Sequence, residues 1–209
     1  MAEETSSQLM KLWMIRHGEP EASARGRCYG SLDFGLSVEG KHQIQAVASA
    51  LSGEKWAAIY TSPRRRCLQS ARILAAAHCC PIEAIDALAE IDFGEFEGRT
   101  YDEIAIRYPD LYRQWMERPT EICFPQGESF EAMWTRVTEA ASAIRTRHMG
   151  QSIAFVTHGG VIRILIAEVL GVPRSHIFRI AQRYGALNLI SYFENSSVVE
   201  VLNYSPGSN

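Results

Sequence analysis

The sequence predicts an α/β protein with a mostly parallel sheet sandwiched between helices. Three short apolar runs, at residues 12–15, 57–60 and 152–157, lack the polar alternation of a half-exposed strand. Such runs are typical of strands buried on both faces. Segments with apolar residues at helical spacing follow each run, and strands that alternate with helices form a sheet covered on both sides.

Start and stop signals place the helices. Ser37 can cap a helix that continues to about residue 51, and Pro63 suits the first turn of the next helix. Thr100, with a glutamate three residues later, forms a capping box. Apolar residues at helical intervals predict a long helix from Phe130 to near residue 150. A further helix is expected over residues 161–170, closed by a glycine and then a proline.

The remaining strands have weaker signals. Residues 81–85 form a short extended segment, and residues 187–192 and 198–202 predict a terminal hairpin around the turn at residues 195–197. We therefore expect two antiparallel strands at one edge of the sheet.

The length of 209 residues suits a single domain. We assign it to residues 11–204, with flexible termini at residues 1–10 and 205–209. Residues 91–126 are the least periodic and are rich in aromatic and charged side chains. They are the expected small cap insertion over a site.

The composition describes a folded protein: 46% of the residues are hydrophobic, 22% are charged, and the net charge is −3. This balance argues against a broad nucleic-acid or anionic-membrane surface. No apolar run is long enough to span a membrane, and the acidic, polar start does not resemble a secretory signal. The five cysteines lack framework spacing, which favours reduced thiols and a cytoplasmic location.

Two histidines directly follow predicted strands. His17 ends the first strand in the run Arg-His-Gly-Glu, and His158 ends the strand at residues 152–157. Ligands of open α/β sheets lie beyond the carboxyl ends of the strands, so the two imidazoles are expected to share a pocket. An arginine from residues 64–66 and the start of the helix after Gly160 add positive charge, which together predict a phosphoryl site.

Each feature alone has a simpler interpretation. A histidine at a strand end is more often structural, and three consecutive arginines more often form a solvated helix face. Glu95 and Glu97 are most simply exposed turn carboxylates. Residues 78–80 (His-Cys-Cys) lack the paired spacing of a metal site. The combination of histidines and arginines at the ends of the predicted strands is what favours a catalytic site.

Four ordered segments resemble the histidine phosphatase superfamily, the phosphoglycerate mutase-like group. They are residues 12–19 (LWMIRHGE), 60–71 (YTSPRRRCLQSA), 88–98 (LAEIDFGEFEG) and 155–160 (FVTHGG). The resemblance implies the phosphoglycerate mutase-like fold and covers nearly the whole chain.

The resemblance also implies roles. His17 is the expected nucleophile, phosphorylated during turnover, and Arg16, Arg66 and His158 are expected to hold the phosphoryl oxygens. Glu90 is the expected general acid and, in the second step, the base that activates water. Neither a metal nor another cofactor is expected, because arginines supply the positive charge that phosphoryl transfer needs.

Two positions complete the expected phosphate-binding set. Gly159 lets the backbone approach a ligand closely. Ser23 stands where the family has an asparagine, so a phosphate contact from that position is in doubt.

The expected function is a metal-independent phosphomonoesterase acting on a small phosphorylated metabolite. Only 68 positions separate Glu90 from His158, a short insertion that favours a phosphatase over a mutase. Residues 27–37 and 124–130 resemble α-ribazole phosphatases, so α-ribazole 5′-phosphate or a sugar phosphate is the expected substrate. Five aromatic residues are candidate walls for the leaving group or else parts of the core: Tyr29, Phe93, Phe96, Tyr112 and Trp115.

Other functions stay open. A phosphoglycerate mutase, which is an isomerase, has the same motifs, and a non-catalytic relative would bind phosphate without turnover. A metal hydrolase could use His17 and His158 as ligands. For any of these, nucleic-acid and membrane partners are not expected, and a homodimer is left open.

Overall fold

The structure is a computed structural model that describes residues 8–207 of the chain. Its centre is a six-stranded sheet with the order β3-β2-β4-β1-β5-β6. Neighbouring strands from β3 to β1 are parallel, whereas β5 runs antiparallel to both β1 and β6. The strands are β1 (Gln8–Arg16), β2 (Ile59–Thr61), β3 (Ile82–Ala84), β4 (Ser152–Thr157), β5 (Leu187–Phe193) and β6 (Ser197–Tyr204). The predicted fold class is therefore confirmed, including the terminal hairpin.

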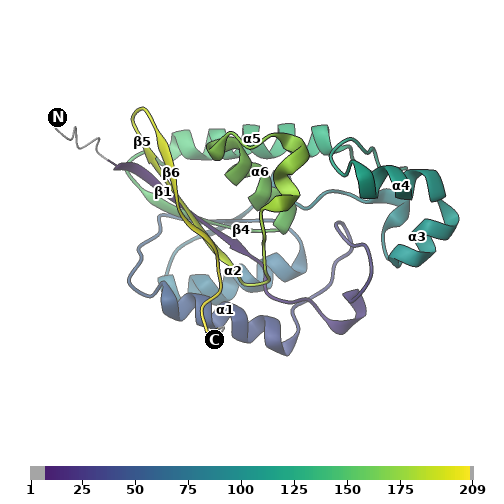
Figure 1. The fold of residues 1–209 in the computed structure, drawn as a ribbon. Helices are drawn as coiled ribbons and strands as arrows, with labels where there is room; N and C mark the ends of the chain where they lie inside the picture. Colours follow the sequence, from purple (N-terminus) through teal and green to yellow (C-terminus); the bar gives the residue numbers. More distant parts are fainter. Residues whose placement is uncertain (1–7, 208–209) are drawn as a thin grey trace.

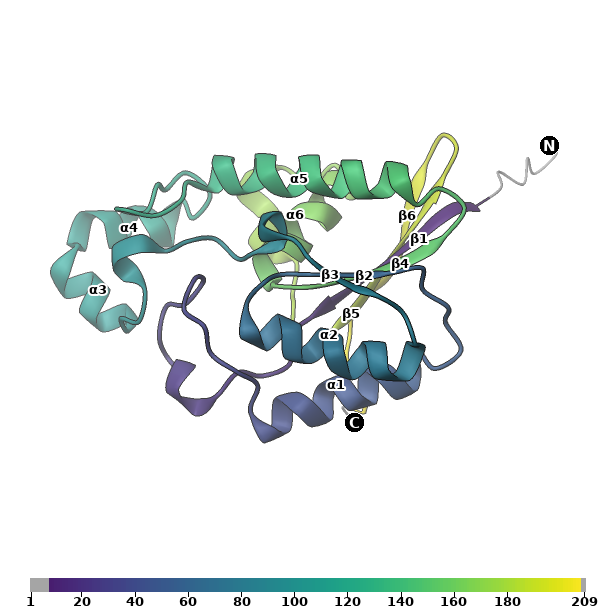
Figure 2. The ribbon, with the colours of Figure 1, turned by 180° about the vertical axis from the view of Figure 1, so that it is seen from behind.

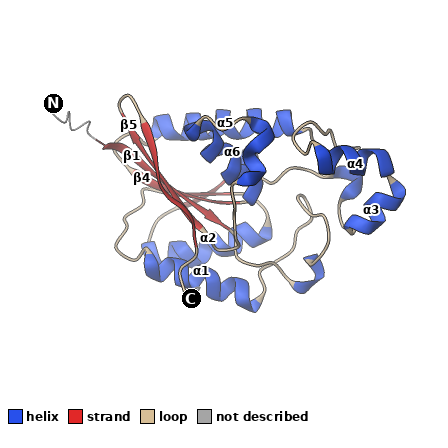
Figure 3. Ribbon diagram, in the orientation of Figure 1, coloured by secondary structure: helices blue, strands red, loops and turns tan. Residues whose placement is uncertain are grey.

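Helices cover both faces of the sheet, as Figures 1 and 2 show from opposite sides. One face carries α1 (Val38–Ala50) and α2 (Arg65–His78), and the other carries α5 (Phe130–Arg147) and α6 (Gly159–Leu170). Short 3-10 turns lie at Ala22–Ala24, Asp86–Leu88, Gly94–Phe96 and Arg174–Arg179. Figure 3 shows the resulting helix–sheet–helix layering.

The two central strands, β1 and β4, contribute side chains to two separate hydrophobic cores. In β1, Leu12 and Met14 point into the core on the α5/α6 side, while Trp13 and Ile15 point into the core on the α1/α2 side. The residues of β4 alternate in the same way. Because successive strand side chains point to opposite faces, a continuous apolar run is what a strand covered on both sides requires.

Several helix signals act as predicted. The Ser37 side chain accepts a hydrogen bond from the Gly40 N–H, and Thr100 forms both bonds of a capping box with Glu103. Helix α6 ends at Gly171 in the left-handed conformation. Pro63 lies outside α2, just before the cap residue of that helix, so it does not occupy the predicted first turn.

The ends of the chain differ slightly from expectation. Strand β1 begins at Gln8, three residues before the predicted domain boundary, and Met10 is already buried in the core. Strand β6 ends at Tyr204. The flexibility predicted for residues 1–7 and 208–209 falls outside the described residues.

The segment expected to form a cap carries α3 (Tyr101–Arg107) and α4 (Pro109–Glu117). These helices project from one end of the molecule, beside the loop that follows β1 (Figures 1 and 2). A bridge between Arg27 and Thr100 ties that loop to the start of α3. Along residues 8–207, no helix has the length and apolarity needed to cross a membrane.

Candidate active site

The parallel register of β1 and β4 brings the two predicted histidines together. Arg16 lies opposite Thr157, so the next residue of each strand, His17 and His158, leaves the sheet at the same level. The His17 N–H donates to the Thr157 carbonyl at 3.0 Å. The two rings are 5.1 Å apart between centroids, and their residues are only 2% and 1% exposed. The predicted convergence at the strand ends is therefore present.

One hydrogen bond selects the tautomer of His17. Its Nδ1 lies 2.8 Å from the Gly18 carbonyl oxygen, which can only accept, so the proton of the neutral ring belongs on Nδ1. Burial, followed by the positive charges of Arg66 and Arg16, holds the pKa of His17 well below its usual range. The ring is thus neutral at physiological pH, with the Nε2 lone pair free to act as a nucleophile.

Three neighbouring side chains contact the ring nitrogens of His158. Its Nε2 is 2.8 Å from the Ser62 hydroxyl, its Nδ1 is 3.3 Å from Arg66 Nη2, and the Cys67 thiol is 3.4 Å from Nε2. Burial lowers the pKa of His158 well below the usual value, and the neighbouring cations, Arg66 first, lower it further. These contacts set the ring orientation beside His17.

The two predicted phosphate-binding arginines are held by carbonyl oxygens. Arg66 is fully buried on α2 and donates to the Leu32 and Gly30 carbonyls at 2.8 Å each. Arg16 donates to the Gln182 carbonyl at 2.6 Å. In each guanidinium the Nε is buried without a hydrogen-bond partner among residues 8–207. Buried donors of this kind seek an acceptor, and an anionic oxygen is the strongest one.

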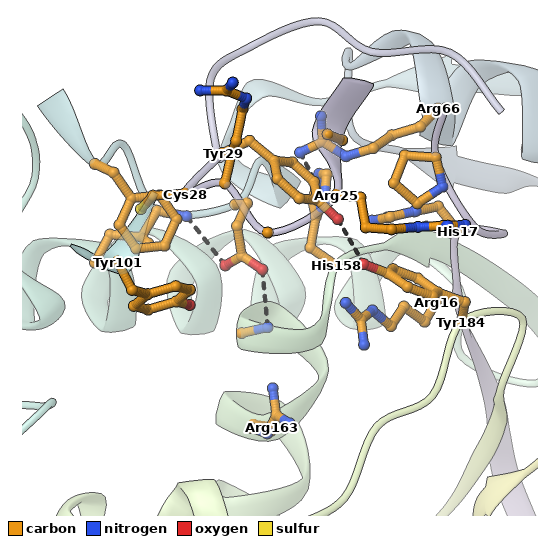
Figure 4. Close-up of a pocket in the computed structure, with 18 of the residues that line it drawn as sticks. Arg16, His17, Arg25, Cys28, Tyr29, Arg66, Tyr101, His158, Arg163 and Tyr184 are labelled. Atoms are coloured by element: carbon orange, nitrogen blue, oxygen red, sulfur yellow. Dashed lines mark hydrogen bonds between the residues drawn. The ribbon is translucent and has the colours of Figure 1, made fainter. Parts of the chain in front are cut away.

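Two tyrosines cover the arginines, as Figure 4 shows. The Tyr184 ring centroid is 4.1 Å from Cζ of Arg16, and the Tyr29 ring centroid is 5.1 Å from Cζ of Arg66. The two tyrosine hydroxyls hydrogen-bond to each other at 2.6 Å. The cations are therefore screened from bulk water on one side, which strengthens their field inside the pocket.

Glu90 faces the same pocket from the loop after β3. Its Oε2 accepts the Gly160 N–H at 3.1 Å, and its Oε1 accepts the Ile91 N–H at 3.1 Å. The start of α6, predicted as an open anion site, thus has its Gly160 N–H occupied by this carboxylate. A Cβ at Gly160 would lie 2.2 Å from Glu90 Oε1, so a larger residue there would displace the Glu90 carboxylate from its present position.

Two predicted phosphate contacts are placed differently. Ser23 is exposed in the 3-10 turn and does not line the pocket, whereas its neighbour Ala24 is buried and does. Successive residues of a 3-10 turn point about 120° apart, so only one of the two can face inward. Gly159 is buried at the start of α6 beside the Arg16 guanidinium and does not line the pocket, whereas its neighbour Gly160 does.

The pocket is a cavity of about 470 Å³ lined by both charged and apolar side chains. Of the five candidate aromatic walls, Tyr29, Phe93 and Trp115 line it. Phe96 is fully buried in the core, and Tyr112 packs against that core. Further apolar lining comes from Ile91, Tyr101, Phe124, Phe130, Met133 and Phe178. The volume is in the range of small-molecule sites.

Two charged residues near the site were missed or misread from the sequence. Glu97 is not an exposed turn carboxylate, because it accepts four backbone N–H groups, including those of Gly30 and Leu32. Arg136 on α5 donates to three carbonyls of residues 87–90 and forms a two-bond ion pair with Glu128. Both residues hold loops of the site in place through hydrogen bonds to the backbone. No pattern in the sequence indicates this role for either of them.

Metal binding has no donor cluster to support it. Within the described chain, the side chains of histidine, cysteine, aspartate and glutamate form no group of three or more that could hold a metal ion. The site instead combines two buried neutral imidazoles, two guanidinium groups and one carboxylate. Such a set can bind a phosphoryl group, attack it and supply a proton.

The fold and this arrangement define a phosphatase of the α/β class, and comparison with known proteins agrees. The sequence model of the histidine phosphatase superfamily (branch 1) matches residues 12–205. The chain belongs to this superfamily and is a phosphomonoesterase.

Individual relatives cover nearly the whole chain. Phosphoserine phosphatase 1 of Hydrogenobacter thermophilus is 32% identical, over 93% of this chain and 92% of its own. The adenosylcobalamin/α-ribazole phosphatase of Escherichia coli is 27% identical, over 93% and 96%. The crystal structure of the α-ribazole phosphatase from Shigella flexneri has a TM-score of 0.85 at 28% identity, covering 96% of this chain and all of that one.

Proposed function

We propose that this phosphatase acts through a phosphohistidine at His17. The Nε2 lone pair attacks phosphorus, and the bond from phosphorus to the ester oxygen breaks with its electron pair on that oxygen. Glu90 supplies the proton that this oxygen takes up. Glu90, now a carboxylate, then removes a proton from water, whose oxygen attacks phosphorus and releases inorganic phosphate while His17 regains its lone pair.

The observation that carries this proposal is the pair of buried neutral imidazoles, 5.1 Å apart, beside two arginines that have no carboxylate partner within residues 8–207. A phosphoryl group beside them would receive hydrogen bonds from Arg16 and Arg66, and from the Nε2–H of His158 when this group turns from the Ser62 hydroxyl to the ligand. Charge neutralisation of this kind is the main requirement of phosphoryl transfer.

We further propose that the preferred ester has a bulky, flat leaving group, as α-ribazole 5′-phosphate does. Phe93, Trp115, Phe130 and Met133 line the pocket and offer apolar surface and ring faces to a leaving group. The name of the Escherichia coli and Shigella relatives fits this chemistry.

Phosphoserine is the second candidate. Arg25 and Arg163 also line the pocket, and a cation there could receive the carboxylate of a small amino-acid ester. The 32% identical relative is named for that substrate. A mutase or a non-catalytic relative is the remaining alternative, and nothing in the pocket favours either.

The deciding experiment compares kcat/KM for α-ribazole 5′-phosphate, phosphoserine, a sugar phosphate and 3-phosphoglycerate, with and without excess EDTA. We expect EDTA-resistant release of phosphate and the highest kcat/KM for α-ribazole 5′-phosphate. Isomerised phosphoglycerate would instead indicate a mutase, EDTA-sensitive release a metal hydrolase, and phosphate binding without any turnover a non-catalytic relative.

Two variants test the roles. His17→Ala should abolish turnover of every ester, and Glu90→Gln should slow the alkyl esters far more than p-nitrophenyl phosphate, whose leaving group needs little protonation. Appreciable turnover by the first variant, or equal losses by the second, would contradict the assignment. The cytoplasmic location and a homodimer remain predictions.

A further inference from the structure

Glu97 lies at the centre of a dense set of backbone hydrogen bonds next to the site. Its Oε1 accepts N–H groups of Gly30 at 2.8 Å, Ser31 at 2.9 Å and Phe93 at 3.1 Å. Its Oε2 accepts those of Gly30 at 3.1 Å and Leu32 at 3.3 Å. A carboxylate that accepts so many backbone bonds fixes the loop around it.

The same loop holds the buried guanidinium. Gly30 and Leu32, whose N–H groups point to Glu97, present their carbonyl oxygens to Nη2 and Nη1 of Arg66 at 2.8 Å. The residues between the anion and the cation are therefore polarised in one direction. A buried positive charge needs compensation, and here the compensating carboxylate acts through the backbone without occupying the face of Arg66 that would receive a ligand.

The close fit of the loop supports a rigid connection. A Cβ at Gly30 would lie 1.8 Å from the Ile91 carbonyl oxygen. The backbone of Cys28 exchanges hydrogen bonds with Gly98 and Arg99, both at 2.8 Å. Residues 28–32 and 91–99 therefore move together or not at all.

The neighbouring carboxylates do not share this position. Asp92 accepts the Ser31 hydroxyl and the Gly94 N–H, and so touches neither Gly30 nor Leu32. Glu95 faces outward and accepts the Tyr108 hydroxyl. Only Glu97, among the acidic residues of this loop in the described chain, contacts both residues that hold Arg66.

We propose that Glu97 is a positioning residue for Arg66: through residues 30–32 it holds the guanidinium in the orientation that binds the phosphoryl group. This inference rests on the proposed phosphate-binding role of Arg66. It makes phosphate affinity, more than leaving-group chemistry, the quantity that Glu97 controls.

The test measures competitive inhibition by inorganic phosphate, with p-nitrophenyl phosphate as substrate. In Glu97→Gln an amide nitrogen replaces one oxygen and meets the Leu32 N–H as a second donor. We expect the inhibition constant and KM to rise roughly tenfold, as loss of an outer-shell partner does at metal sites, with a smaller change in kcat. Glu95→Gln is the matched control and should leave both constants unchanged.

A double-mutant cycle separates positioning from general loosening. Arg66→Lys alone should weaken phosphate by roughly tenfold or more, since lysine lacks the planar fork. If Glu97 acts through Arg66, adding Glu97→Gln to Arg66→Lys should cost less than about twofold more. The inference would be overturned if Glu97→Gln raised the inhibition constant by the same factor in the wild-type protein and in Arg66→Lys. It would also be overturned if Glu97→Gln had no effect in the wild-type protein.

Two further results are distinguishable from these. Unchanged phosphate inhibition in Arg66→Lys would contradict the proposed phosphate-binding role of Arg66, and it would contradict this inference as well. If Glu97→Gln does not fold, Glu97→Asp takes its place in the cycle, because it keeps the charge but withdraws it from the loop. An additive loss in that cycle would equally overturn the positioning role.

Discussion

Replacing Gly160 by alanine would displace the Glu90 carboxylate, the proposed general acid, without changing the chemical nature of that side chain. The new Cβ would lie 2.2 Å from Glu90 Oε1 and 3.0 Å from the Met133 methyl carbon. The shorter distance is about 1.2 Å less than ordinary van der Waals contact, which begins at 3.4 Å. The carboxylate is the flexible partner, so it must swing away and lose its hydrogen bond to the Gly160 N–H.

The expected magnitude follows from that displacement. A misplacement of about 1 Å in a catalytic group costs on the order of 100-fold in rate, within the range of roughly 10² to 10⁴ that a positioned acid contributes. We expect Gly160→Ala to lower kcat/KM for an alkyl ester, such as a sugar phosphate, by about 100-fold. For p-nitrophenyl phosphate the loss should stay below about tenfold, since the leaving group is already stable as an anion.

The stability expected of Gly160→Ala and a control variant separate a displaced carboxylate from unfolding as the cause of a lower rate. Alanine is favoured over glycine inside a helix by about 1 kcal/mol, so helix propensity at this position gives no reason for unfolding. Gly53→Ala is the matched control, because a Cβ there meets no atom within 4 Å. Undiminished turnover of the alkyl ester by a folded Gly160→Ala protein would refute the placement of the acid. Equal losses on both esters would mean that the phosphate site, and not proton delivery, had been disturbed.

Two further predictions concern buried titratable groups. His17 and His158 have a lowered pKa in the folded protein, so below about pH 6.5 the unfolded chain binds protons that the folded chain excludes. The free energy of unfolding should then fall as the pH falls, by up to about 1.4 kcal/mol per pH unit for each histidine; denaturant titrations between pH 7.5 and 5.5 measure the slope, and a flat profile would contradict it. Burial raises the pKa of Cys67 to about 12, so its thiol should resist iodoacetamide at pH 8 while exposed Cys79 and Cys123 react; mass spectrometry of the native protein would reveal early labelling at Cys67, which would contradict its burial.

Local patterns in the sequence were sufficient for the elements that carry the chemistry. The runs that became β1 and β4 had no alternation because both faces of each strand are covered, and the histidines at their ends met because parallel neighbours end at one edge. The cap residues Ser37 and Thr100 form the bonds expected of them. In these cases the physical cause lies within a few residues of the signal.

Features set by long-range loop contacts could not be predicted. Glu97 looked like an exposed turn carboxylate because three of its four backbone partners lie more than 60 positions earlier in the chain. Arg136 belongs to a helix face with no motif, and its carbonyl partners are 46 to 49 positions away. Ser23 was placed by spacing alone, and one 3-10 turn was enough to point it outward.

The arginines of the site divide into two classes by what holds them. Arg136 forms a two-bond ion pair with Glu128, so its charge is cancelled and it serves to fasten the Glu90 loop. Arg16 and Arg66, by contrast, have no carboxylate within ion-pair distance among residues 8–207. Backbone carbonyls, tyrosine rings and, for Arg66, the His158 ring orient them.

A carbonyl dipole fixes a guanidinium without neutralising it. The full charge of Arg16 and Arg66 therefore remains available to an anionic ligand in the pocket. Keeping the Arg66 cation buried costs the fold stability, and Glu97, acting through the backbone of residues 30–32, offsets that cost. A direct salt bridge to Arg66 would stabilise the free protein more simply, but it would compete with the phosphoryl group for the same donors.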